Sequence, residues 1–225
     1  MEDNEYPWPQ EGDTPFVEDG DTIETARLVL SRAGWCDYAK SYKWAADLIA
    51  HRIINCPHAD NVRDLSESPD MLVYPVVFMY RHYLELCMKL LIGYDYISRR
   101  AVPIPREHKL ELLWGRCRPI LEEIWPGKQC KDLDVIERSI SQFPRVDPGS
   151  TAFRYPPAST DEQAFGQLKS VNLRDLSQVI DGIDAFFDAV DAMPTAWMDG
   201  QDNAQFPLAV EDDEDVSSPY WPGDW

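Results

Sequence analysis

Residues 68–93 place the strongest limit on how this chain can fold. They open with Ser68-Pro69-Asp70 and continue with ten residues, 71–80, that are apolar apart from Pro75. Proline is tolerated in the first turns of a helix, where a missing backbone N–H costs least. A helix that is apolar on several sides is normally buried. We therefore expect a central helix from Ser68 to about Gly93, in which Glu85 and Lys89 form an i,i+4 ion pair.

Four other segments have helical patterns. Apolar residues recur at three- and four-residue spacing over 37–54 and 172–193, with Asp37 and Asn172 as the expected N-terminal caps. Residues 109–125 are expected to form a helix that is kinked or split near Pro119, and residues 133–143 a fourth. Residues 94–107 are expected to be a basic connection, and residues 144–170 a loop or small hairpin. With no repeat and no alternating strand pattern, the sequence predicts an all-α, four- to five-helix up-and-down bundle.

The acidic residues lie mainly at the two ends of the chain. The formal net charge is −19, yet residues 1–24 hold nine acids and residues 181–225 hold twelve, with no lysine or arginine in either segment. Between them, 19 acids face all 21 bases, so the body of the chain is close to neutral. We expect an acidic extended arm over 1–24, a helical bundle over 25–193 and an acidic aromatic tail over 194–225.

The sequence favours a cytoplasmic protein without a metal or cofactor. Its apolar runs are shorter than the ~20 residues of a membrane span, and it begins Met-Glu-Asp rather than with a basic signal segment. The five cysteines have no C-x-x-C spacing, which favours buried thiols over a disulfide framework or zinc site. Metal-ligand motifs, glycine-rich phosphate loops and nucleophile elbows are missing from the sequence.

The central segment carries a resemblance to a known superfamily. Its residues read Tyr80-Arg-His-Tyr-Leu-Glu-Leu-Cys-Met-Lys-Leu-Leu-Ile92, and His108-Lys-Leu-Glu-Leu-Leu-Trp114 follows after a short gap. This order resembles the signature of HEPN-type helical domains. The resemblance implies a helical bundle, often a homodimer or part of a hetero-complex, in prokaryotic anti-phage, abortive-infection or toxin-type systems.

Many HEPN proteins are metal-independent ribonucleases that use an arginine followed, after four to six residues, by a histidine near the last helix. Here the last predicted helix contains Arg174 but no histidine. Only Arg52 and His58 have the required spacing, so they are the candidate catalytic pair. Histidine can act as the base toward a ribose 2′-OH, and arginine can stabilise a phosphorane. A chance spacing of a helix-end arginine and a loop histidine is the alternative.

Several further residues are candidates for binding. The polar residues of the central helix predict a partly buried network that reaches the next helix and either fixes helix register or contacts a ligand or RNA. The arginines after this helix could hold phosphate or dock the acidic ends, or simply be solvated. The candidates are Arg81, His82, Glu85, Lys89 and His108 in the network, Arg99, Arg100 and Arg106 in the connection, Arg154 between two aromatics, and Trp221 and Trp225 in the tail.

These observations lead to three expectations about function. The first is a HEPN-like interaction or effector component of a defence or toxin-type system, without a standard ribonuclease site and with a protein partner from the same system. The second is an active, metal-independent HEPN endoribonuclease that cleaves RNA. The third is an inhibitor whose acidic ends mimic nucleic acid and block a DNA-binding partner.

Overall fold

The described part of the chain is mainly helical, with no β-strand. The computed structural model describes residues 25, 26, 28, 32–55, 68–99, 104–124, 130–155 and 165–191. The helices are α1 (Arg32–Asn55), α2 (Pro69–Arg99), α3 (Leu110–Ile124), α4 (Cys130–Ile140), α5 (Gln142–Val146) and α6 (Leu173–Asp191). The predicted all-α class is therefore confirmed. The arm over 1–24 and the tail over 194–225 lie outside the described residues.

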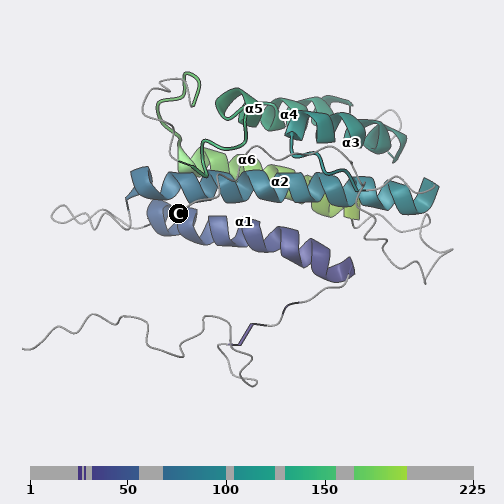
Figure 1. Ribbon diagram of the computed structural model, residues 1–225, viewed down its shortest axis with the longest axis horizontal. Helices are drawn as coiled ribbons and strands as arrows, with labels where there is room; N and C mark the ends of the chain where they lie inside the picture. The colour runs from purple at the N-terminus through teal and green to yellow at the C-terminus, as the bar shows by residue number, and fades with distance from the viewer. Residues whose placement is uncertain are drawn as a thin grey trace, which may run out of the picture. The chain divides into compact units, whose positions relative to one another are not determined.

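Helix α2 lies at the centre of the bundle. Figure 1 shows α1 along one side of α2, α3 to α5 along the other, and α6 packed against α1 and α2. The middle of α2 is enclosed by these neighbours, and its side chains of Tyr80, Tyr83, Leu84 and Met88 are fully buried. Each large apolar side chain buried in this way contributes about 1.5–3 kcal/mol. The prediction of a buried central helix is confirmed.

Helix α1 packs closely on α2 because its inward face consists largely of alanine. Ala39, Ala46 and Ala50 are buried at three- to four-residue steps with Lys43 among them. Tyr42 of α1 contacts His82 of α2. Asp47, which lies further along α1, contacts Tyr80, which lies earlier in α2. The two helices are therefore antiparallel.

The helix ends confirm some expectations and correct others. Asn172 caps α6, since its Oδ1 accepts the backbone N–H groups of Arg174 and Asp175 at 3.0 and 3.3 Å. Asp37 is not a cap, because α1 begins at Arg32. The basic connection is shorter than expected, because α2 runs through Gly93 to Arg99.

The remaining differences lie in the second half of the bundle. Helix α3 is continuous across Pro119 rather than split. The segment expected to form one helix over 133–143 is divided into α4 and the single turn α5, with Ser141 between them. In the parts of 144–170 that the structure describes, residues 144–146 end α5 and the rest form turns and loops, with no hairpin strand.

Candidate functional site

A buried polar network occupies one face of α2. Arg81, Glu85 and Lys89 follow one another at four-residue spacing, and only 7%, 3% and 8% of their surfaces are exposed. Nη1 of Arg81 lies 3.4 Å from Oε2 of Glu85, and Nζ of Lys89 donates to its Oε1 at 3.0 Å. Buried charges persist only where they are paired. The expected i,i+4 ion pair is thus present inside a larger network.

His108 joins this network from the segment just before α3. Its Nδ1 lies 2.8 Å from Oε1 of Glu85. Burial alone would raise the pKa of Glu85, but the hydrogen bonds from His108 and Lys89 outweigh it and hold the pKa at about 2. Glu85 is therefore an ionised acceptor, and the Nδ1 of His108 is the donor. The predicted connection between the central helix and His108 is confirmed.

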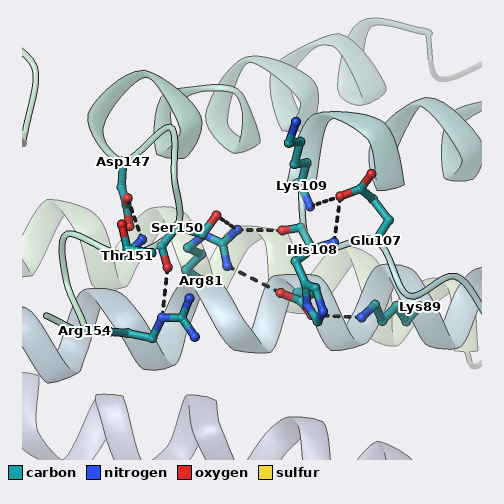
Figure 2. Close-up of polar contacts among 10 residues, drawn as sticks. Arg81, Lys89, Glu107, His108, Lys109, Asp147, Ser150, Thr151 and Arg154 are labelled. Carbon is teal, nitrogen blue, oxygen red and sulfur yellow. Dashed lines mark hydrogen bonds and ion pairs between the residues drawn. The ribbon is translucent and has the colours of Figure 1, made fainter. Parts of the chain in front are cut away.

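Two contacts fix the backbone around His108. Oε1 of Glu107 accepts the backbone N–H groups of His108 and Lys109, each at 2.8 Å. Nη2 of Arg81 donates to the carbonyl oxygen of His108 at 2.6 Å. Figure 2 shows these groups converging on His108 from α2 and from the segment just before α3. The imidazole is therefore held in place although 71% of its side chain is exposed.

Arg81 also ties α2 to the loop after α5. Its Nη2 donates to the Oγ of Ser150, a residue with a φ of 58° in the left-handed region. The turn is held by Asp147, whose Oδ1 accepts the backbone N–H groups of Thr151 and Ala152 at 2.9 and 3.2 Å. Burial lowers the pKa of Arg81, and the nearby carboxylates of Glu85 and Asp147 oppose that effect. Arg81 thus connects three parts of the bundle.

His82 and Arg154 belong to an aromatic row beside the network. The imidazole of His82 stacks on Phe78 at 5.9 Å between ring centres and meets Tyr42 edge-on at 4.5 Å. Burial lowers the pKa of His82. The guanidinium of Arg154 lies 5.9 Å from the centre of the Phe78 ring and 5.7 Å from that of Tyr155. Arg154 therefore contacts Tyr155, one of its two aromatic neighbours in the sequence, and Phe78 of α2. His82 packs on aromatic rings rather than joining the network of Arg81, Glu85 and Lys89.

A second polar network, which sequence reasoning missed, joins α1 to α6. Nζ of Lys43 lies 2.8 Å from Asp47 and 2.6 Å from Asp181, and Lys40 pairs with Asp184 and, at 2.6 Å, with Asp188. The tyrosine hydroxyls of α2 complete it, since Tyr80 donates to Asp47 and Tyr83 donates to Asp184. The signal in the sequence is the spacing of Asp181, Asp184 and Asp188 in α6, which places them on one face of a helix. They belong to the bundle rather than to a solvated acidic end.

The described arginines that follow α2 differ in their surroundings. Arg118 is bound by Glu122, Asp134 and Glu137, and so links α3 to α4. Arg106 and Arg116 are exposed. Arg100 and the side chain of Arg99 lie outside the described part of the chain.

The candidate catalytic pair is described only in part. Arg52 is exposed in the last turn of α1. His58 lies outside the described residues, as do Trp221 and Trp225. The pairing of Arg52 with His58 and the docking of the tail therefore stay predictions.

The described residues hold no cluster of three metal-ligating side chains. In the same residues, no helix is both long and apolar enough to cross a membrane. A shallow depression lies beside the network and is too small to enclose a ligand. It is lined by Arg81, Lys109, Leu110, Glu111, Pro144, Asp147, Pro148 and Ser150.

The outward face of α1 carries large apolar side chains. Trp44 is 56% exposed and Leu48 is 74% exposed, and both lie opposite the buried alanine stripe. Tyr38, 53% exposed, lies at the edge of this face. Contiguous exposed apolar groups with a polar rim are typical of interaction surfaces. We call residues 37, 41, 44, 48 and 52 the α1 face.

Comparisons with protein-family models, with curated proteins and with solved structures gave no significant match.

Proposed function

We propose that the protein is a HEPN-like helical interaction or effector component of a prokaryotic defence or toxin-type system, and that it acts by binding a protein partner. The observation that carries this is the α1 face, where Trp44 and Leu48 present apolar surface to solvent from the middle of a helix. Tryptophan is enriched among the residues that contribute most to binding at protein interfaces, and such residues cluster near the centre of the interface.

The packing of α1 supports a binding role for its outward side. Lys40 and Lys43 anchor the helix to α6, and Tyr80 of α2 donates to Asp47 at 2.7 Å. A helix fixed in this way presents Trp44 and Leu48 without ordering a loop first, which lowers the entropic cost of binding.

The network on α2 is assigned a structural role in this proposal. Glu85 accepts from three cationic or imidazole donors of the same chain, and Arg81 bridges α2 to two loops. Such a network sets helix register and the path of the chain into α3.

Co-purification tests the binding role. The full chain is co-expressed with the proteins encoded by the genes on either side of its own. Each of these proteins is tested for co-purification with the wild type, with Trp44→Ala and with Leu48→Ala. Leu112→Ala on α3, which removes a leucine that is also half-exposed, is the matched control. We expect one flanking product to bind the wild type and the control and to be lost from both α1 variants. Equal binding by all four proteins would contradict the role of the α1 face.

A second candidate function is metal-independent cleavage of RNA, and the Glu85–His108 pair favours it. The imidazole is exposed, and its Nδ1 proton is held by an ionised carboxylate. Nε2 is then the nitrogen left to act as a base toward a ribose 2′-OH. This differs from the predicted pair, Arg52 and His58, because the base lies in the network rather than after α1.

Cleavage of single-stranded RNA in EDTA separates the two candidates. Loss of such cleavage in His108→Ala, with retention in the exposed control His51→Ala, would establish the second function at the network. Loss in His58→Ala would favour the predicted pair instead. We expect no cleavage above a mock preparation from any of these proteins, in keeping with a binding role.

A further inference from the structure

We infer that Cys36 of α1 and Cys87 of α2 form a site of reversible oxidation, at which a hydroperoxide converts the two thiols into a disulfide. Both residues are thiols in this structure, Cys36 partly exposed and Cys87 buried. The inference does not depend on the proposed function, because it concerns the contact between two helices of one chain rather than the α1 face.

The packing of α1 against α2 places the two cysteines at the same level of the bundle. The carboxylate of Asp184 in α6 binds Lys40 of α1 and also accepts the hydroxyl of Tyr83 in α2. Cys36 lies four residues before Lys40, on the same face of α1. Cys87 lies four residues after Tyr83, on the same face of α2. Because the two helices are antiparallel, both steps lead in the same direction along the bundle, and the two cysteines lie side by side.

The two helices approach closely enough at this level for a disulfide. Figure 1 shows α1 running alongside α2, and Ala39, which follows Cys36 on the inward face of α1, is only 1% exposed. Helices that pack through small residues have axes about 8 Å apart, and their Cα atoms lie about 2.3 Å from each axis. Cα atoms that face each other across such a contact come within the range of about 4.4–6.8 Å that a disulfide spans.

The surroundings of the two thiols give them different roles. Cys87 belongs to the apolar core, whereas Cys36 packs against its edge. Burial, and to a smaller extent the neighbouring Cys36, raises the pKa of Cys87 to about 12. Peroxides react with thiolates rather than with thiols. Cys36, which solvent reaches, is therefore the residue that reacts with the oxidant, and Cys87 is the residue that closes the disulfide.

The reaction has two steps. In the first, the thiolate of Cys36 attacks one oxygen of the hydroperoxide and the O–O bond breaks. The other oxygen takes a proton from water and leaves as an alcohol, or as water when the oxidant is hydrogen peroxide, and Cys36 becomes a sulfenic acid. In the second, the sulfur of Cys87 attacks that of Cys36, and the thiol proton of Cys87 leaves with the hydroxyl group as water. The two electrons that the thiols lose have reduced the peroxide, and an external dithiol reverses the reaction by exchange.

Peptide mapping of the full chain tests the inference. Reduced protein is treated with a small excess of hydrogen peroxide, blocked with iodoacetamide and digested with trypsin without a reductant. We expect a new species in which peptide 33–40 is linked to peptide 82–89, and we expect dithiothreitol to remove it. Cys117→Ala, which removes a fully buried thiol of α3, is the matched control and should form the same species.

Two variants test the separate roles of the thiols. Cys36→Ser should form no disulfide that includes Cys87. Cys87→Ala should leave the sulfenic acid of Cys36 without its partner, so dimedone should label Cys36 far more strongly in this variant than in the wild type. A disulfide that closes a loop of about 50 residues restricts the unfolded chain, so oxidation should raise the melting temperature of the wild type by roughly 5–15 °C. Oxidation should not raise that of Cys36→Ser.

Three outcomes would overturn the inference. These are a wild-type chain in which Cys36 stays reduced, one in which Cys36 is oxidised without linkage to Cys87, and one in which Cys36 links mainly to another cysteine. If circular dichroism shows that Cys87→Ala does not fold, the comparison of the wild type with Cys36→Ser still decides between these outcomes, since the serine replaces a partly exposed side chain. Binding of a flanking gene product is measured separately, so the proposed function can fail without affecting this result.

Discussion

Replacing Glu85 by glutamine tests how much the buried network contributes to stability. The variant keeps the shape of the side chain but leaves Arg81 and Lys89 buried without their counter-charge, at positions that were 3.4 and 3.0 Å from the carboxylate. Breaking a buried ion pair by removing one partner costs about 3–5 kcal/mol. Since glutamine can still accept one hydrogen bond, we expect the lower end of this range.

The depressed pKa of Glu85 gives the same magnitude by a second route. A folded-state pKa of about 2, against an ordinary value of 4.5, corresponds to about 3 kcal/mol of stability at neutral pH. For a chain of this size, that loss lowers the melting temperature by roughly 6–12 °C.

Urea unfolding at pH 7, followed by circular dichroism at 222 nm, measures the effect. Glu122→Gln is the matched control, because Glu122 is an exposed i,i+4 partner of Arg118 and its loss should cost less than about 1 kcal/mol. Adding Lys89→Met to Glu85→Gln should restore at least about 1 kcal/mol, since it removes an unpaired buried charge. The reasoning would be refuted if Glu85→Gln were no more destabilising than Glu122→Gln.

The remaining predictions concern pH, the second network and the thiols. Because the pKa of Glu85 is depressed, the contribution of its carboxylate to stability is fully present above about pH 4.5 and is lost as the pH falls toward 2. Over that pH range, the stability of Glu85→Gln should therefore fall less steeply than that of the wild type. Asp184→Asn should cost about 2 kcal/mol in urea unfolding, and the more exposed Asp188→Asn less than about 1 kcal/mol; equal losses would contradict the assigned network. Burial raises the pKa of the Cys87 thiol to about 12 and also raises that of Cys117, so both should resist Ellman's reagent in the native state and react on unfolding, as mass spectrometry of the labelled peptides would show.

The parts of the fold that the sequence predicts are those set by local patterns. The start of α2 at Pro69 and the cap at Asn172 follow from the chemistry of helix ends, which involves only neighbouring residues. The Glu85–Lys89 pair follows from four-residue spacing on one helix. These features needed no knowledge of the tertiary structure.

The parts that it missed depend on tertiary packing. Helix α2 continues through Gly93 because a glycine inside a helix costs only about 1 kcal/mol, which packing can offset. The contact between Lys43 and Asp181 joins residues 138 positions apart, and no local pattern says which helices are neighbours. His82 was expected in the network with Glu85, but its ring stacks on Phe78 instead. That placement depends on how α1 and α2 pack together, since Tyr42 of α1 meets the same ring.

The exposed anchors of α1 show a further limit of sequence patterns. Trp44 and Leu48 fit the three- and four-residue spacing of a helix as well as the buried alanines do, so spacing alone does not tell which stripe faces inward. The small residues decide it, because Ala39, Ala46 and Ala50 allow α1 to approach α2 closely. The large residues are then left on the solvent side.

The efficiency of plating of a phage panel on cells that carry the native locus tests the central claim most directly. The account predicts that the wild type and His108→Ala protect equally, whereas Trp44→Ala together with Leu48→Ala abolishes protection at an unchanged protein level. Protection that survives the loss of both α1 anchors but disappears in His108→Ala would contradict it, and would place the activity at the Glu85–His108 pair.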